Sequence, residues 1–155
     1  MSEGADNRAL YEITIIYIPL FQLNSLQQIS SSRDAHVIFR QSWNQHIHHR
    51  ESFYVLFLSK SNKVIAVQEI SRGGNHCTVL DVKMIVQSIA LLNAGAIIVG
   101  HNHPSCNLKP SEADKALTKT IRDVMRLIEV DFLDHLILSP QGGYFSFADE
   151  GLHYE

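Results

Sequence analysis

Two histidines and an aspartate have the identity and the spacing of a metal site. One residue separates His101 from His103, and Asp114 follows His103 after ten intervening residues. Pro104 pushes the residue before it toward extended backbone, in which residues i and i+2 point to the same side. We therefore expect both imidazole rings to face one ion. Two nitrogens and one oxygen would leave the fourth position of a tetrahedral ion open, which is typical of catalytic rather than structural zinc.

Each of these side chains also has a purely structural alternative. His101 and His103 could be ordinary loop histidines. Ser111 is a good cap for a following helix, and Asp114 lies three residues later, where a carboxylate favours the positive end of a helix and can reach back to the capping residue. Taken one at a time, the side chains favour the structural reading. The combined spacing, with prolines at positions 104 and 110, favours a metal.

Length and composition indicate one globular domain without a membrane span. The chain has 155 residues, of which 45% are hydrophobic, and a net charge of −3. We expect residues 1–9 to form a disordered tail and residues 10–155 a single domain. The two cysteines define no disulfide framework, and no signal peptide is visible, so we expect a cytoplasmic protein. The acidic balance argues against a non-specific nucleic-acid binder.

Hydrophobic patterning predicts strands and helices that alternate along the chain. Helices are expected from residue 34 to 43, from 81 to 94 as a buried helix with Asp81 as the cap, and from the Ser111 cap to about 128. Strands are expected at 10–18, 52–58, 64–70, 95–100, 132–139 and 144–147, with 52–58 and 64–70 forming a hairpin. This order predicts an α/β fold, in which helices pack on a mixed sheet.

The motif His101-x-His103-Pro104, followed by Pro110-Ser111-x-x-Asp114, resembles the JAMM metalloprotease motif of the JAB/MPN domain. The segments 51–58, 100–105 and 134–137 resemble the RadC branch of that family. The resemblance runs from about residue 10 to the end of the chain. It implies a three-layer architecture like that of cytidine deaminases, with a mostly antiparallel central sheet between helices.

The resemblance also implies the chemistry of the site. It implies a zinc ion held by His101, His103 and Asp114, although iron, cobalt and manganese accept the same donors. It further implies a glutamate base at the start of a central strand, which is Glu51 by position. Spacing alone does not select Glu51, because Glu69 and Glu112 also lie near the expected site. The family serine corresponds to Ser111, which would stabilise an oxyanion.

One residue departs from the family pattern. Cys106 stands where RadC-like sequences have glycine after Pro-Ser. Because cysteine resists the left-handed backbone that glycine allows, we expect the loop to be reshaped there. Cys106 could also close the site as a fourth ligand, but its distance of three residues from His103 argues against this. Ser105 is expected to shape the loop, with a minor prospect of contacting substrate.

Three functions compete. The first is a JAMM-type peptidase or isopeptidase that acts on a peptide or protein substrate. The second is a DNA-repair-associated accessory protein of RadC type. Longer RadC relatives carry an N-terminal helical region associated with DNA binding, whereas about fifty residues precede Glu51 here, and they indicate a strand and one helix. The third is a catalytically silent MPN-like scaffold, against which the complete residue set argues. The oligomeric state is not predicted.

Overall fold

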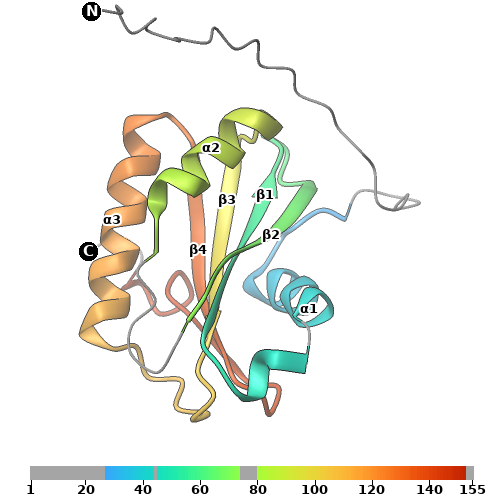
Figure 1. Ribbon diagram of the computed structural model, residues 1–155. Coiled ribbons are helices and arrows are strands. Elements are labelled where there is room, and N and C mark those ends of the chain that lie inside the picture. Colours follow the sequence, from blue (N-terminus) through green and yellow to red (C-terminus); the bar gives the residue numbers. More distant parts are fainter. Residues whose placement is uncertain (1–26, 44, 74–79, 153–155) are drawn as a thin grey trace, which may run out of the picture.

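A five-stranded sheet forms the centre of the molecule in the computed structural model, which describes residues 27–43, 45–73 and 80–152 (Figure 1). The strand order is β2-β1-β3-β4-β5. Only β3 and β4 pair in parallel among these neighbours; the other pairs are antiparallel. The elements, in chain order, are α1 (Ser32–Ser42), the 3-10 turn η1 (Gln45–His48), β1 (Ser52–Leu58), β2 (Val64–Arg72), α2 (Val82–Leu92), β3 (Ala96–Asn102), α3 (Glu112–Leu127), β4 (Asp131–Leu138) and β5 (Tyr144–Ser146).

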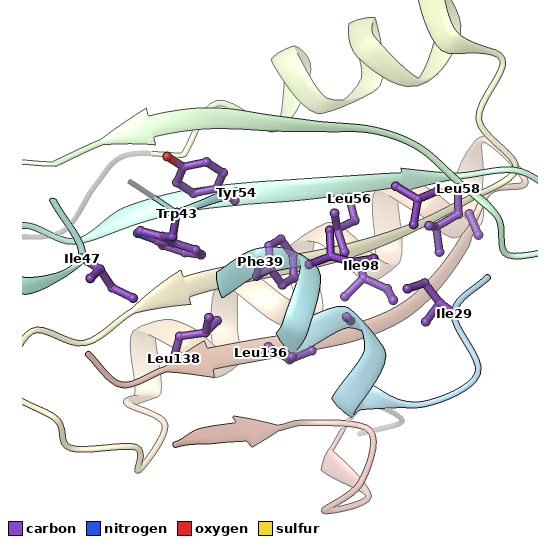
Figure 2. Close-up of a cluster of buried hydrophobic side chains, with 14 residues drawn as sticks. Ile29, Phe39, Trp43, Ile47, Tyr54, Leu56, Leu58, Ile98, Leu136 and Leu138 are labelled. Carbon is purple, nitrogen blue, oxygen red and sulfur yellow. The ribbon is translucent and has the colours of Figure 1, made fainter. Parts of the chain in front are cut away.

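Helices cover both faces of the sheet and create three layers (Figure 1). Helix α1 lies on one face, where it contacts β1 and β4, while α2 and α3 lie on the other. Each face therefore has its own apolar core. The core under α1 gathers large side chains from the helix and the sheet, shown in Figure 2: Ile29, Phe39, Trp43, Ile47, Tyr54, Leu56, Leu58, Ile98, Leu136 and Leu138.

The two central strands divide their side chains between these cores. Every residue of β1 and of β3 is buried, which explains why both strands are apolar without alternation. On β1, Leu56 and Leu58 point toward α1, whereas Val55 and Phe57 belong to the core under α2 and α3. This alternation continues to the end of β3, so neighbouring residues there must also face opposite layers.

Each helix begins at a side-chain cap that satisfies its free amide groups. Ser31 and Asp34 form a reciprocal capping box at the start of α1, and Ser111 and Asp114 form another at the start of α3. The Asp81 carboxylate accepts a hydrogen bond from the backbone amide of Lys83 at 3.0 Å and caps α2. The cap positions expected for α2 and α3 are confirmed.

Close packing joins α1 to the strand that leads to the candidate site. Gly100 lies under the ring of Phe39, and a Cβ added there would come within 3.0 Å of a ring carbon. A larger residue would push the helix away from the sheet. Glycine at this position therefore sets the distance between α1 and the strand residue that directly precedes His101.

The predicted α/β class, with a mostly antiparallel mixed sheet between helices, is confirmed. Several helix and strand ends differ by one or two residues, and three differences matter for the site or the packing. Strand β3 continues to Asn102 through its pairing with β4, and β2 continues to Arg72 through its pairing with β1. Helix α2 was expected to be buried, but it is amphipathic, with Ile85 and Ile89 inward and Leu91 45% exposed. The expected tail at 1–9, the strand at 10–18 and Cys77 lie outside the described residues.

Within the described ranges, none of the helices combines the length and the apolar character that crossing a bilayer would require.

Candidate metal centre

The end of β3 and the first turn of α3 together form the centre. His101 is the second-last residue of β3 and is buried. His103 lies just beyond the strand, and its amide donates to the carbonyl of Leu138 at 2.9 Å, which prolongs the extended pairing with β4. Asp114 is the third residue of α3, whose N-terminus lies over this strand end. Backbone pairing therefore aims both rings at one carboxylate.

The three side chains converge to metal-binding distances. Nε2 of His101 lies 2.9 Å from Nε2 of His103 and 3.1 Å from Oδ1 of Asp114. Nε2 of His103 lies 3.6 Å from Oδ2 of Asp114. Ligands of one tetrahedral zinc ion are separated by about 3.3 Å, given bonds of roughly 2.0–2.1 Å. The donor set therefore fits zinc, as the spacing of the motif predicts, and no fourth His, Cys, Asp or Glu of the described residues joins the group.

The ring of His103 is held in the tautomer that can bind a metal through Nε2. Its Nδ1 contacts the backbone carbonyl of Asn107. A carbonyl oxygen can only accept a hydrogen bond, so Nδ1 carries the proton and donates it. In the neutral ring, Nε2 then presents a lone pair toward His101 and Asp114. This arrangement, in which a backbone carbonyl orients a ligating histidine, is common around metal ions in proteins.

The Asp114 carboxylate serves the helix cap and the metal centre at the same time. Its Oδ2 accepts hydrogen bonds from the amide and the hydroxyl of Ser111, both at 2.7 Å, while Oδ1 faces His101. Burial acts to raise the pKa of the Asp114 carboxyl, but in the metal-free protein the hydrogen bond and charge of a protonated His101 and the two bonds from Ser111 outweigh it. The pKa is therefore held well below its usual value. The carboxylate is ionised at neutral pH, as a metal ligand must be.

Ser111 lies at the rim of the centre. Its Oγ accepts a hydrogen bond from the Asp114 amide at 3.1 Å and donates to the Asp114 carboxylate. The structural alternative for this serine is therefore present, because it caps α3. The same contacts keep the hydroxyl beside a ligand, and a rotation about its Cα–Cβ bond would release the proton to another acceptor.

Glu51 directly precedes β1 and is exposed. It is not a member of the ligand group. The register of β1 and β3 ends at the pair of Phe53 with His101, and the same register continued by two residues would place residue 51 opposite residue 103. Residues 51 and 53 share one face of extended backbone, and the Phe53 ring stacks against His101. The continued register therefore places Glu51 at the strand end that carries the two imidazoles.

The side chain of Asn102 fixes the backbone on both sides of Glu51. Asn102 is fully buried and points away from the histidines that flank it. Its amide group donates to the carbonyls of Ile47 and Arg50, both at 2.8 Å, and its oxygen accepts from the Ser52 amide at 2.8 Å. One strand end thus presents the two histidines on one face and, through Asn102 on the other face, holds the backbone on both sides of Glu51.

The other two acidic candidates have different partners. Glu69 makes two hydrogen bonds of 2.7 Å with Arg72, which lower the pKa of the Glu69 carboxyl. Glu112 pairs with Lys115 at 2.8 Å, and its side chain is 89% exposed. Neither belongs to the ligand group. Their contacts are explained without the metal centre.

Cys106 adopts the left-handed backbone that we expected it to resist, with φ +63°. The expectation of a reshaped backbone at this position is therefore wrong. The turn is closed because the Cys106 amide donates to the His103 carbonyl at 2.9 Å, and this turn carries Asn107 to the His103 ring. Cys106 is not a member of the ligand group, and Ser105 accepts a hydrogen bond from the Asn107 amide, as a loop-shaping residue would.

Comparison with known proteins agrees with this geometry. The RadC-like JAB domain matches residues 29–152, which is most of the chain. The chain belongs to this family. Among similar proteins are UPF0758 proteins of Flavobacterium johnsoniae, 42% identical over 127 residues, and of Porphyromonas gingivalis, 44% identical over 103 residues. These matches cover 82% and 66% of this chain but 54% and 45% of the relatives, so the chain spans about half the length of the curated relatives it matches.

Sequence reasoning missed three residues of this RadC-like JAB domain that support its centre. His135 contacts the candidate ligand His101, and Thr118 donates a hydrogen bond to the backbone carbonyl of Asp114. Asn102 holds the backbone around Glu51. His135 is a hydrogen-bonded buried histidine, and one of its partners is the candidate ligand His101. A buried polar residue between two ligands was the available signal for Asn102. No pattern in the sequence connects Thr118 to the site.

We expect Asn102→Ala to lower the free energy of unfolding by about 3 kcal/mol, because two buried backbone groups and one partly buried backbone group lose their partner. Urea denaturation measures this loss. Asn107→Ala is the matched control: its side chain bonds only the exposed Lys109 amide among the described contacts, so the change should stay within about 0.5 kcal/mol. Equal stability of the two variants would contradict the bracing role of Asn102.

We expect Cys106→Gly to raise the free energy of unfolding by roughly 1 kcal/mol, because glycine adopts a positive φ without strain. Cys106→Ala separates backbone strain from the thiol and should leave stability near that of the wild type. Thermal and urea denaturation of metal-free protein measure both effects. Stabilisation by Ala as well as by Gly would show that the thiol, rather than the backbone, limits stability.

Proposed function

We propose that this RadC-like JAB domain is a zinc-dependent hydrolase of the JAMM type, which cleaves a peptide or isopeptide bond. The open group of two imidazoles and one carboxylate carries the proposal, because three protein ligands leave a position for water or substrate. His101, His103 and Asp114 would hold the ion. When bound, zinc makes a water molecule more acidic and polarises a carbonyl group. Iron, cobalt or manganese could fill the same donor set.

Glu51 takes the proton of the attacking water and passes it to the leaving amine in this proposal. Two observations support this role of Glu51. The register of β1 and β3 directs Glu51 toward the strand end that carries the imidazoles, and Asn102 holds the backbone on both sides of it. An exposed carboxylate at the mouth of the centre can reach solvent and substrate. The engagement of Glu69 and Glu112 with basic side chains favours Glu51 over both.

Ser111 donates a hydrogen bond to the oxyanion that develops on the attacked carbonyl in this proposal. Its hydroxyl lies beside Asp114, and a rotation that breaks one hydrogen bond would free its proton. The substrate is a peptide or protein whose identity the proposal leaves open. We place the reaction in the cytoplasm, because the cysteine content indicates no disulfide framework.

A RadC-type accessory role with DNA is the second candidate, and membership of the RadC-like family supports it more directly than hydrolysis. The net charge of −3 opposes tight binding to the phosphate backbone. Titration of labelled DNA at increasing salt separates the two candidates. Salt-sensitive binding together with absent hydrolysis would favour the accessory role. Metal uptake without either activity would favour a silent scaffold.

We expect the wild-type protein to bind one equivalent of zinc and to hydrolyse members of a peptide library in a chelator-sensitive reaction. Glu51→Gln should keep the zinc but lower turnover by about 100-fold or more, because the amide cannot accept the proton. Glu112→Gln is the matched control on an exposed glutamate and should retain full turnover. A Glu51→Gln variant with wild-type turnover would refute the assigned base.

The two capping boxes allow the cap role of Ser111 to be separated from a catalytic one. We expect Ser31→Ala and Ser111→Ala each to lower the free energy of unfolding by about 1 kcal/mol. Only Ser111→Ala should also reduce kcat, by roughly 100-fold, if its hydroxyl stabilises the oxyanion. Zinc affinity of both variants shows whether Asp114 has moved. Full turnover of Ser111→Ala at saturating zinc would leave the serine with the cap role alone.

A further inference from the structure

His135 connects the candidate metal centre to α3 through both of its ring nitrogens. Nε2 lies 2.8 Å from Nδ1 of His101, and Nδ1 lies 2.7 Å from Oγ1 of Thr118. The residue is fully buried on β4, where its ring stacks on Phe147 with centroids 4.9 Å apart and meets the edge of Phe53. Packing therefore fixes the ring plane, and a flip would break both contacts.

A carbonyl oxygen sets the direction of every hydrogen bond in this chain of contacts. The hydroxyl of Thr118 donates to the backbone carbonyl of Asp114 at 2.6 Å, and it has only one proton to give. Thr118 must then accept the hydrogen bond from His135, so Nδ1 of His135 carries a proton.

The ring of His135 is neutral in this arrangement, because a second proton would place a charge at a fully buried position. Nε2 of His135 is thus an acceptor, and Nδ1 of His101 must be the donor. With its proton on Nδ1, His101 turns the lone pair of Nε2 toward His103 and Asp114. The backbone carbonyl of Asp114 thereby selects the tautomer of His101, and Nε2 of His101 faces the side-chain carboxylate of Asp114.

We propose that Thr118 and His135 are positioning residues that lock His101 in the tautomer able to bind the metal through Nε2. We call the path from the Asp114 carbonyl through Thr118 and His135 to His101 the tautomer relay. Without it, His101 would also populate the form with the proton on Nε2, which cannot bind through that atom. The proposal rests on the metal-binding part of the proposed function and not on hydrolysis.

The helix α3 contains a matched pair of threonines for the test. Thr118 and Thr120 both donate a hydroxyl proton to the carbonyl four residues earlier, at 2.6 and 3.0 Å, but Thr120 is exposed and does not contact His135. Replacement by the equally shaped valine removes the hydroxyl in each case. We expect Thr118→Val to weaken zinc binding by about tenfold or more, and Thr120→Val to leave it within about twofold of wild type.

Nitrogen-15 NMR of the histidine rings supplies a readout that altered packing alone would not move. In wild-type and Thr120→Val protein, with or without zinc, His135 should show its proton on Nδ1 and an accepting Nε2. In Thr118→Val, the signal should shift toward a mixture of tautomers. His135→Phe keeps an aromatic ring but removes the acceptor, and it should weaken zinc binding about as much as Thr118→Val or more.

The outcomes distinguish the relay from the metal site itself. Wild-type protein that takes up no metal would overturn the proposed function, while the tautomer of its His135 would still decide the relay. A proton on Nε2 of wild-type His135 would overturn the relay whether or not any variant folds. Equal zinc affinity of Thr118→Val and Thr120→Val would overturn it as well.

Discussion

Three electron-rich atoms face one another at the end of β3, and this arrangement requires a positive charge between them. Nε2 of His101 and Nε2 of His103 are only 2.9 Å apart, and an ionised carboxylate stands beside both. Two lone pairs and a negative charge repel at this distance unless a proton or a metal ion shares them. The surrounding structure works against that repulsion, since strand pairing, a helix cap and oriented hydrogen bonds hold each group in place.

Several ligand contacts use a group that also maintains secondary structure. Asp114 completes the capping box of α3 with one carboxylate oxygen and faces His101 with the other. The equivalent carboxylate of the α1 box, Asp34, bonds Ser30 and Ser31 and belongs to no ligand group among the described residues. The same local motif is therefore only a cap in one helix and a cap with a candidate metal ligand in the other. The difference is the strand end that lies opposite α3.

The alternation of side chains along β3 separates the tasks of adjacent residues. His101 and His103 face the layer of α3, while Asn102 faces the layer of α1 and binds the chain that leads to Glu51. A shift of one residue in the strand register would exchange these faces, so that both the candidate metal centre and the hydrogen bonds of Asn102 would be lost. Burial of every residue in β1 and β3 makes such a slip costly, because large apolar side chains on both faces would lose their packing. The precision of the centre thus originates in the two apolar cores.

Patterns within short segments predicted much of this protein. The strands 52–58 and 64–70, the cap residues Asp81 and Ser111 and the ligand triplet were recognisable because each depends on neighbours within a few residues or on one strand followed by one helix. The ends of β2 and β3 were placed too early, because the polar residues there are held by pairing with β1 and with β4, respectively. The exposed face of α2 was not anticipated, since an apolar helix at the edge of a layer has the composition of a buried one.

The amino-acid sequence by itself determined the ligand types, their order and the start of the helix that carries the carboxylate, because these are local properties of the chain. Tertiary structure alone decided the rest. It brought His135 of β4 onto the ring of His101 and Thr118 of α3 onto the ring of His135, across separations of 34 and 17 residues along the chain. It also imposed a left-handed turn on Cys106, because contacts on both sides of the loop outweigh the preference of a single residue.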